Sequence, residues 1–538
     1  MSTAVRDRGR WRPALDRPAL AALLLGLAGL GYRLVLTLLT VPVSNSDEAT
    51  FGLAALHIAE GREHPIFLYG QRYMGMAEAY LAAPLVAVAG PSWPVLRLPV
   101  LALWALFVFL AYRLTRRICA PWFAVLVVGL LALGPERVLR DQLQAVGGRP
   151  EVKPAVLAIL LVAVGLADGR VRSRPLAAGA AGLLAGLAVW SDWLIVPYLA
   201  AAVLLLAWVL RRELLGWCGA ALAAGFAVGA VPLIVDSLRA SPGQDSLSVV
   251  RRISGEAGAA PPLAGRLRGG LLEGVPLATG LCPAGGCARW QQWFGVAYPV
   301  LLVAAAVLAL VAYRRAAAGP AGDRVGPAAQ LALVAGAAST LAAYVRSPLA
   351  ATDPLNNARY LSVLQLSLPV VLWPLWVAAR HVWRGPAGAA GRLAGASATA
   401  ALAGLAATAL AATGLFVAGL GPLRVEERQA RQLADVVRRA GLRAVYGEYW
   451  TCNRLVFETA EEVLCGVLDG RLMPGQNRYR PYWRQVALAD RPGYVLVAGS
   501  PADRRLRELL GPRAGAALRA EVGRYRVYHP ETAVRPWR

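Results

Sequence analysis

The sequence predicts an all-α polytopic membrane protein that ends in a small α/β domain. Of its 538 residues, 57% are apolar. These residues form repeated runs that approach the ~20 residues needed to cross a ~30 Å hydrocarbon layer as a helix. After about residue 420, the runs give way to an amphipathic helix pattern and short strand-like segments, which favours a separate α/β domain.

Hydropathy predicts about eleven transmembrane helices within residues 19–419, the membrane domain. The first, 19–41, is longer than the apolar core of a signal peptide and lacks a small-residue cleavage site, so we expect it to stay attached. The apolar segment 74–90 is interpreted as a re-entrant or interfacial helix, because a crossing there would reverse every later loop. The other predicted spans are 95–112, 119–134, 153–168, 175–190, 193–210, 214–235, 294–313, 327–345, 360–380 and 393–418.

Arginine clusters predict the orientation, because short loops rich in Arg stay on the cytoplasmic side. With residues 1–18 as a cytoplasmic tail, the loops 42–75 and 236–293 and the domain 420–538 face the exterior of the plasma membrane. The clusters that then lie inside are Arg113, Arg116 and Arg117; Arg170, Arg172 and Arg174; Arg211 and Arg212; Arg314, Arg315 and Arg324; and Arg380, Arg384 and Arg392.

The formal net charge of +24 does not indicate a nucleic-acid-binding protein. Every basic residue except Lys153 is arginine, and these arginines are scattered between apolar runs instead of gathering on one face. We therefore expect the bilayer, and no nucleic acid, as a partner.

Four cysteines fall in the predicted external segments. An extracytoplasmic compartment is oxidising, so we predict disulfides between Cys282 and Cys287 and between Cys452 and Cys465. The alternative is that all six cysteines are free thiols.

The terminal domain is predicted from short periodic segments. Apolar residues at helical spacing predict a helix over 426–440, and another helix fits 503–510. Short strands are predicted at 444–449, 455–458, 494–498 and 525–528.

The first external loop concentrates polar residues beside the bilayer. It begins "VPVSNSDEATFGLAALHIAEG", in which Asp47 and Glu48 start an amphipathic helix. One interpretation is local: Ser46 or Asp47 caps the helix and Glu48 favours its dipole. The other is functional, because "HPIFLYGQRYMGMAEAYLAAPL" adds charge where unpaired charge is costly. The residues that it adds are Arg72, Tyr73, Glu78 and Tyr80.

These motifs resemble the GT-C glycosyltransferases, which include protein O-mannosyltransferases and aminoarabinose lipid A transferases. The resemblance lies in the Asp-Glu pair, "YGQRYMG", "EAYLAAPL" and "VLRLPVLALWALFVFLAYRLTRR", followed by "GGRPE" at 147–151 and "NNARYLSVLQLSLP". In the tail, "YWTCNRLVFETAEEVLCG" and "NRYRPYWRQV" are similar to an extracytoplasmic domain of bacterial members. The second external loop, between the predicted spans 119–134 and 153–168, departs from the family pattern, because it carries Glu151 where better-studied branches carry an Asp.

The resemblance implies a sugar donor on a polyprenyl phosphate and a glycan, lipid or protein acceptor outside the membrane. Asp47 would be the general base of an inverting transfer. Glu48 and Glu151 would orient the acceptor or hold Mg²⁺ or Mn²⁺. Cations would stabilise the departing phosphate, and the other residues would line the substrate site. The cations are Arg72, Arg97, Arg359 and Lys153, and the other lining residues are Tyr73, Glu78 and Tyr360.

Several of these residues also have ordinary explanations. Arg97 could extend from a span end to the interface, and Arg359 with Tyr360 could be an interfacial anchor pair. Asp192 fits a loop cap as well as a sugar contact, and His57 and His64 lack metal-ligand spacing. The tail aromatics fit core packing or a sugar-stacking face. These aromatics are Trp450, Tyr479, Tyr482 and Trp483.

Two other classes of function remain open from the sequence. A lipid or glycan transporter would place ionisable residues near mid-membrane on broken helices, whereas the predicted spans are nearly free of charge. A non-catalytic membrane scaffold would use the tail to bind a partner.

Overall fold

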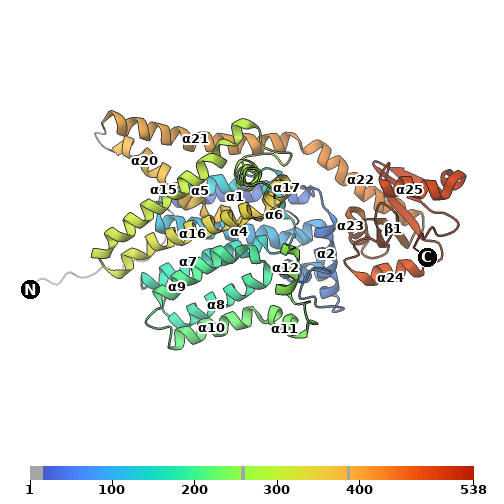
Figure 1. Ribbon diagram of the computed structural model, residues 1–538, viewed down its shortest axis with the longest axis horizontal. Helices are drawn as coiled ribbons and strands as arrows, with labels where there is room; N and C mark the ends of the chain where they lie inside the picture. Colours follow the sequence, from blue (N-terminus) through green and yellow to red (C-terminus); the bar gives the residue numbers. More distant parts are fainter. Residues whose placement is uncertain (1–15, 256–260, 385–387, 538) are drawn as a thin grey trace, which may run out of the picture.

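The computed structural model describes residues 16–255, 261–384 and 388–537. A body of long helices forms one part of the molecule, and the C-terminal α/β domain caps one end of it (Figure 1). The loop 42–75, with α2 (Ser46–Ala59), lies at that same end, beside α23 (Tyr449–Glu458) of the domain. Residues 1–15 of the predicted cytoplasmic tail lie outside the described residues.

Seven helical segments of the described chain are long and apolar enough to cross a membrane, and two bent pairs bring the number to nine. The predicted count of about eleven is therefore not confirmed: α9 (Val196–Val209) is short, and α8 (Arg174–Ser191) is rich in Gly and Ala. The bent pairs are α5 (Pro121–Ala132) with α6 (Glu136–Leu143), at 93°, and α10 (Trp217–Gly229) with α11 (Val231–Arg239), at 57°. The seven segments are Arg17–Leu38, Trp93–Ile118, Arg149–Ala167, Arg289–Ala318, Gly322–Arg346, Pro354–Arg380 and Ala389–Ala418.

The α-helices within these seven segments are α1 (Arg17–Leu38), α4 (Trp93–Ile118), α7 (Arg149–Ala167), α15 (Trp293–Arg315), α16 (Val325–Arg346), α18 (Pro354–Asn357), α19 (Leu368–Val371), α20 (Trp373–Arg384) and α21 (Ala389–Ala418). The other helices of the body are α3 (Ala77–Ala89), α12 (Ser246–Gly255), α13 (Leu263–Leu267), α14 (Val275–Ala278) and α17 (Leu349–Thr352). Tighter or wider helical turns are η1 (Trp193–Ile195), η2 (Arg268–Gly274), η3 (Arg289–Gln291), η4 (Ala316–Ala318), η5 (Ala321–Arg324) and η6 (Ala358–Ser367).

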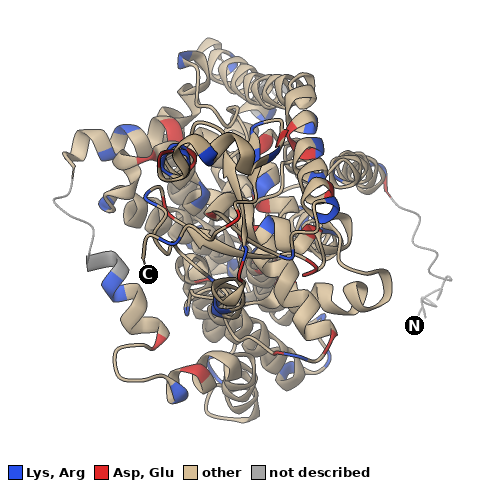
Figure 2. Ribbon diagram, turned by 90° about the vertical axis from the view of Figure 1, so that its right-hand side faces the viewer, with Lys and Arg blue, Asp and Glu red and all other residues tan. Residues whose placement is uncertain are grey.

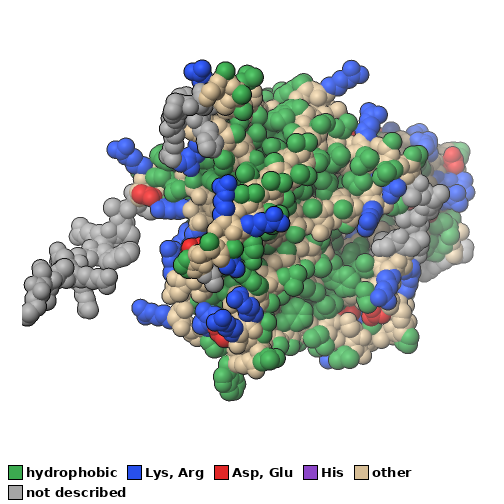
Figure 3. Space-filling view, turned by 60° about the vertical axis from the view of Figure 1, so that its left-hand side comes forward, with side chains coloured by type: hydrophobic (Ala, Val, Ile, Leu, Met, Phe, Trp, Pro, Cys, Tyr) green, Lys and Arg blue, Asp and Glu red, His purple; other side chains and the backbone are tan. Residues whose placement is uncertain are grey.

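The surface of the body matches a lipid environment. Hydrophobic side chains cover a broad band of one face, and Arg side chains lie mainly toward its edges (Figure 3). Helix α3, with 13 residues, is about 20 Å long, less than the hydrocarbon thickness of about 30 Å. The expectation of nearly uncharged spans has an exception in α1, where the fully buried Arg33 donates to the carbonyls of Leu131, Ala132 and Leu133.

The C-terminal domain is built on a five-stranded sheet of order β2-β1-β3-β5-β4. Strands β1 (Ala444–Glu448), β2 (Leu464–Leu468) and β3 (Gly493–Val497) are parallel, and the antiparallel β5 (Tyr525–Tyr528) and β4 (Leu518–Val522) complete one side. One face packs on α22 and α23, and the other packs on α24 and α25. The helices of the domain are α22 (Leu420–Arg439), α23, α24 (Arg480–Leu488), α25 (Pro501–Leu510), η7 (Gly511–Arg513) and α26 (Ala514–Ala517).

Most of the predicted tail elements are present, with one error. Residues 455–458, predicted as a strand, belong to helix α23. This helix is buried between α2 on one side and the sheet on the other, so its apolar residues follow one another without the spacing of a one-sided helix. The strands β2 and β4 and the helix α24 were not predicted.

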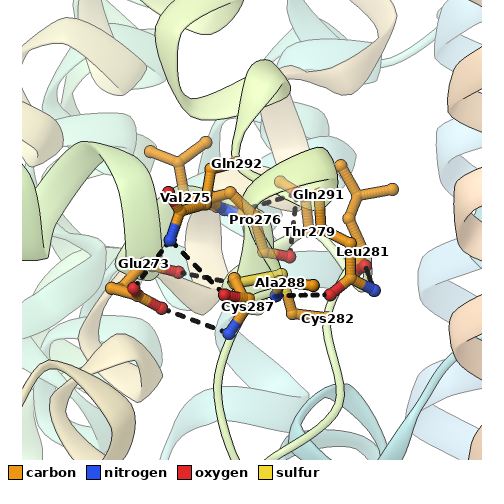
Figure 4. The surroundings of a disulfide bond; sticks show 10 residues. All are labelled: Glu273, Val275, Pro276, Thr279, Leu281, Cys282, Cys287, Ala288, Gln291 and Gln292. Atoms are coloured by element: carbon orange, nitrogen blue, oxygen red, sulfur yellow. Dashed lines mark hydrogen bonds between the residues drawn. A yellow bond between two sulfur atoms is a disulfide. The ribbon is translucent and has the colours of Figure 1, made fainter.

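Both predicted disulfides are present. Cys282 is joined to Cys287, and Cys452 is joined to Cys465, while Cys119 and Cys218 are free thiols. Figure 4 shows the first bond, where Glu273 accepts from the backbone N–H of Cys287 and from the amide of Gln292 at 2.9 Å. The second bond ties the first helix of the C-terminal domain after β1 to strand β2.

Candidate functional site

Helix α2 begins at Ser46, and Asn45 caps it. The Asn45 side chain accepts from the N–H groups of Asp47 and Glu48, both at 3.0 Å. The local interpretation, in which Ser46 or Asp47 is the cap, is therefore wrong. The carboxylates of residues 47 and 48 are free to make other contacts, and successive positions on a helix point about 100° apart.

Glu48 points into the helical body and is fully buried. Its carboxylate binds the guanidinium of Arg97 through two contacts, at 2.6 and 2.7 Å, and also accepts from Gln144 at 3.1 Å. Arg97 donates a further bond to the carbonyl of Pro42 at 2.9 Å. Both side chains are 0% exposed, so this pair joins the first external loop to α4 and faces no open space.

Asp47 points the other way, toward the C-terminal domain, and its side chain is 30% exposed. Its Oδ1 accepts from the hydroxyl of Tyr449 and from Nη2 of Arg478, the latter at 2.8 Å. Arg478 also donates from Nε to the Tyr449 hydroxyl. Burial and the neighbouring Asp47 carboxylate raise the pKa of Tyr449, so its hydroxyl keeps its proton and donates it.

Next to this triangle lies a polar cluster from three parts of the chain. Burial raises the pKa of Tyr73, and Tyr360, Arg478, Arg359 and Asp192 lie near enough to act electrostatically on the same hydroxyl. The predicted residues Tyr73, Arg359 and Tyr360 are thus brought together. The Arg359 guanidinium lies 5.0 Å from the Tyr360 ring centre and donates to its hydroxyl at 3.1 Å.

Two further residues, Arg149 and Asp192, extend this cluster. Arg149, at the start of α7, binds Asp141 at 2.9 Å and lies within electrostatic reach of Asp192 and Tyr360. Asp192 itself caps the turn at η1 by accepting from the N–H of Leu194 at 2.9 Å, as its loop-cap interpretation predicted.

An apolar cavity of about 800 Å³ lies between α3, α4, α7, α8 and α11. Leu81, Leu106 and Val231 of its lining are exposed on the apolar surface, so it opens sideways from the body. Glu151 is the one charged residue in its lining, and within the described chain neither oxygen of its buried carboxylate has a hydrogen-bond partner. Ser191, which also lines the cavity, directly precedes Asp192 of the polar cluster.

Three predicted substrate residues lie apart from the Asp47 carboxylate. Glu78 is buried and accepts from the N–H of Gly147 at 3.0 Å, and Arg72 binds Asp236 of α11 at 3.0 Å. Lys153 is 2% exposed, donates to Gln365 at 3.3 Å and lies 5.8 Å from the Phe107 ring centre. Arg97 is already paired with Glu48, as described above.

Of the remaining sequence candidates, His57, Tyr479 and Tyr482 pack between α2 and the C-terminal domain. His57 is buried and contacts Tyr69 at 2.8 Å, Glu461 at 3.0 Å and Tyr482 at 3.1 Å. Tyr479 packs on the His57 ring with centroids 5.0 Å apart. In contrast, Trp483 packs inside the domain against Tyr446 and Trp537, and Trp450 is 60% exposed.

The residues that sequence reasoning missed are Tyr449 and Arg478, the two partners of Asp47, and Arg149. All three lie inside motifs that the resemblance rests on, "YWTCNRLV", "NRYRPYW" and "GGRPE", but no local pattern marks them. Asp47 and Arg478 are 431 residues apart in the chain, so only the fold brings them together.

The sequence leaves open whether Glu48 and Glu151 orient the acceptor or hold Mg²⁺ or Mn²⁺. Among residues 16–255, 261–384 and 388–537, no group of three or more His, Cys, Asp and Glu side chains could hold a metal ion. Glu48, one of the two proposed ligands, is saturated by Arg97 and Gln144.

The helices and the capping domain are arranged in a GT-C fold. The chain is similar to ArnT, the aminoarabinose lipid A transferase, from Cupriavidus metallidurans bound to undecaprenyl phosphate, with a TM-score of 0.57, 13% identity, and 95% and 98% of the two chains covered. For the apo state of the same protein the TM-score is 0.56 and the identity 15%, with the same coverage. For the oligosaccharyltransferase of Archaeoglobus fulgidus in its apo form, the values are 0.51 and 14%, with 89% and 69% of the two chains covered.

These likenesses show the fold. No protein-family model matches the chain, and no curated protein matches it in sequence.

Proposed function

We propose that this protein is a membrane glycosyltransferase that moves a sugar from a polyprenyl-phosphate donor to an extracytoplasmic acceptor. The observation that carries the proposal is one juxtaposition. An apolar cavity that opens sideways is lined by Ser191, and the next residue, Asp192, lies within electrostatic reach of Arg149 and of the Tyr73 hydroxyl. Arg359 acts electrostatically on the same hydroxyl. Arg478, within reach of the same hydroxyl, contacts the partly exposed carboxylate of Asp47.

The cavity suits the lipid part of such a donor. A polyprenyl chain is apolar, and burying it against Leu, Ala and Pro side chains removes hydrocarbon from water. The lateral opening would let the chain enter from the bilayer. Undecaprenyl phosphate, the lipid bound to the ArnT structure, is a molecule of this kind.

The polar cluster suits the phosphate. Arg149 and Arg359 bring two guanidinium groups, whose planar fork of donors matches phosphate oxygens. The Nε of Arg359 is buried without a hydrogen-bond partner in the described part of the chain, so one donor is available to a ligand. Positive charge held in place before the reaction stabilises the phosphate that leaves.

Asp47 would act as the general base. Its carboxylate takes the proton of the acceptor hydroxyl while that oxygen attacks the anomeric carbon, and the bond from this carbon to the phosphate oxygen breaks with its electron pair leaving on the phosphate. A single displacement from the opposite face inverts the anomeric configuration. Glu48 has no part in this step, since its carboxylate is enclosed with Arg97.

The test is transfer by purified protein in nanodiscs, supplied with a panel of radiolabelled polyprenyl-phosphate sugars and a cell-envelope acceptor fraction. Asp47→Asn should lower the transfer rate by about 10²–10⁴-fold, the usual contribution of a general base, while the thermal unfolding midpoint stays close to wild type. Asp490→Asn, an exposed aspartate on the C-terminal domain, is the matched control. Wild-type transfer by Asp47→Asn would overturn the assigned base, and release of free lipid phosphate without a new glycosidic bond would contradict transfer.

A further inference from the structure

The edge of the C-terminal sheet that faces Asp47 is the one at which α/β sheets usually bind ligands. Strands β1, β2 and β3 run parallel, so their carboxyl ends lie along one edge. Tyr449 directly follows β1, and Arg478 lies in the segment after β2. In open parallel sheets, ligands bind outside these carboxyl ends, near the point where successive connections turn to opposite faces. Here the helices after β1 and β2 lie on opposite faces.

The two contacts from this edge hold Asp47 in a defined orientation. Both fall on Oδ1, one from Tyr449 and one from Arg478. In the described residues, no hydrogen bond engages the Oδ2 of Asp47, so that oxygen is free to meet an acceptor hydroxyl. A base held by a third group is the usual arrangement at sites of proton transfer.

Arg478 has a donor left over. Its side chain is 5% exposed, Nε donates to Tyr449 and Nη2 to Asp47, and Nη1 is buried without an acceptor in the described chain. A buried donor without a partner costs free energy, which favours a ligand or water that accepts from it. The buried Nε of Arg359 has no hydrogen-bond partner among the described residues, and Arg359 lies near enough to the Tyr73 hydroxyl to act on it electrostatically, as Arg478 does.

We propose that Arg478 is a phosphate-binding residue of the donor site, supplied by the C-terminal domain, and that Tyr449 is a positioning residue for Asp47. This rests on the proposed glycosyltransferase function and extends it. Nη1 of Arg478 and Nε of Arg359 donate to oxygens of the lipid phosphate, while Nη2 of Arg478 keeps Asp47 beside the anomeric carbon. The reaction site is therefore incomplete without the C-terminal domain.

The domain is fixed firmly enough to supply such a residue. Glu427 of α22 binds Arg454 at 2.8 Å and the hydroxyl of Ser44 at 3.2 Å, all three buried. Asn453 donates to Thr50 of α2 at 2.8 Å. Figure 2 looks onto this end of the molecule, where basic and acidic residues are interspersed over the domain. Contacts on both sides of Asp47 thus restrict how far Arg478 moves relative to α2.

The experiment measures binding of two probes to the full chain in nanodiscs: undecaprenyl phosphate, and undecaprenol, which lacks the phosphate. Arg478→Gln should weaken binding of undecaprenyl phosphate by about 10–100-fold, the effect of removing a charge-assisted hydrogen bond, and leave undecaprenol binding unchanged. Arg478→Lys keeps the positive charge but lacks the planar fork of donors, so its affinity for undecaprenyl phosphate should lie between those of the wild type and Arg478→Gln. Arg480→Gln, exposed and two residues further along, is the matched control.

Tyr449→Phe separates positioning from phosphate binding. It should bind undecaprenyl phosphate within about 2-fold of wild type but lower the transfer rate at saturating donor by about 10-fold or more, since Asp47 loses one of its two anchors. The pH dependence of this rate should change with it, which a purely structural role would not cause.

The outcomes separate this inference from the proposed function. Equal undecaprenyl phosphate affinity of wild type and Arg478→Gln overturns the phosphate role of Arg478 and leaves the transferase proposal standing. An equal loss of affinity for both probes would mean that Arg478 supports the folded structure only, which also overturns its phosphate role. If the wild type binds neither probe, both proposals fall.

Discussion

The two sides of helix α2 use charge in opposite ways. On the side that faces the helical body, Glu48 and Arg97 form a fully buried pair with two contacts. On the side that faces the C-terminal domain, the adjacent Asp47 is 30% exposed and shares Oδ1 between two residues of another domain. Residues that the sequence presents as one Asp-Glu motif therefore have separate tasks: one attaches the loop, and the other is available for chemistry.

This comparison predicts that breaking the Glu48–Arg97 pair, on the side that faces the helical body, lowers the stability more than breaking the contacts of Asp47. Glu48→Gln leaves Arg97 as a buried charge without a counter-ion, and removing one partner of a buried pair destabilises a protein by about 3–5 kcal/mol. Chemical denaturation in mixed micelles measures this loss. Asp47→Asn in the same assay should lower the unfolding free energy by less than Glu48→Gln does, because Asp47 is 30% exposed, although its partner Arg478 is 5% exposed. An equal loss of unfolding free energy in Glu48→Gln and Asp47→Asn would show that the two sides of α2 contribute alike to stability.

A second, smaller effect is expected on the side that faces the C-terminal domain, where the ionisation of Glu461 makes the stability depend on pH. Burial raises the pKa of this carboxyl, but hydrogen bonds from His57, Arg62 and Tyr482 outweigh burial and bring it down to about 2. A group whose folded pKa is depressed stabilises the fold above its ordinary value near 4.3 and loses that contribution as the pH falls toward 2. The domain should therefore loosen on α2 between about pH 4.5 and 2.

Hydrogen exchange of α2 and α24 across this pH range measures the loosening. Glu461→Gln should remove most of its pH dependence, whereas the half-exposed neighbour, Glu462→Gln, should keep the wild-type profile. A wild-type profile in Glu461→Gln would assign the effect to other groups.

How far the sequence predicts this molecule differs between its two parts. The helical body, the capping domain and both disulfides follow from apolar run length and from cysteine position, which are local properties. The number of spans is less certain, because Gly- and Ala-rich helices such as α8 pack closely in the body with little hydropathy to mark them. Gly182 illustrates this, since a Cβ there would lie 2.1 Å from the carbonyl oxygen of Leu222 in α10.

The candidate site is predicted only in part, for a physical reason. Asp47, Tyr73, Arg359 and Tyr360 could be chosen because polar residues beside a bilayer are conspicuous. Whether such a residue faces a neighbour or open space depends on contacts across hundreds of residues. The sequence suggests Arg97 for phosphate binding, but the structure encloses it with Glu48. Nothing local in the sequence distinguishes Arg478, which binds Asp47, from the other arginines of the tail.

The smallest expected effect concerns Arg72, which the sequence also suggested for phosphate binding. Its pair with Asp236 at 3.0 Å is 40% exposed on the Arg side and 11% exposed on the Asp side, so water screens it more than it screens the fully buried Glu48–Arg97 pair. Arg72→Gln should therefore change the unfolding free energy by less than about 1 kcal/mol and the KM for the donor by less than about 3-fold. A donor KM raised 10-fold or more, with undecaprenol binding unchanged, would instead place Arg72 with Arg478 at the phosphate. The donor site would then extend from Asp47, at the start of α2, to residue 72, near the end of the loop 42–75.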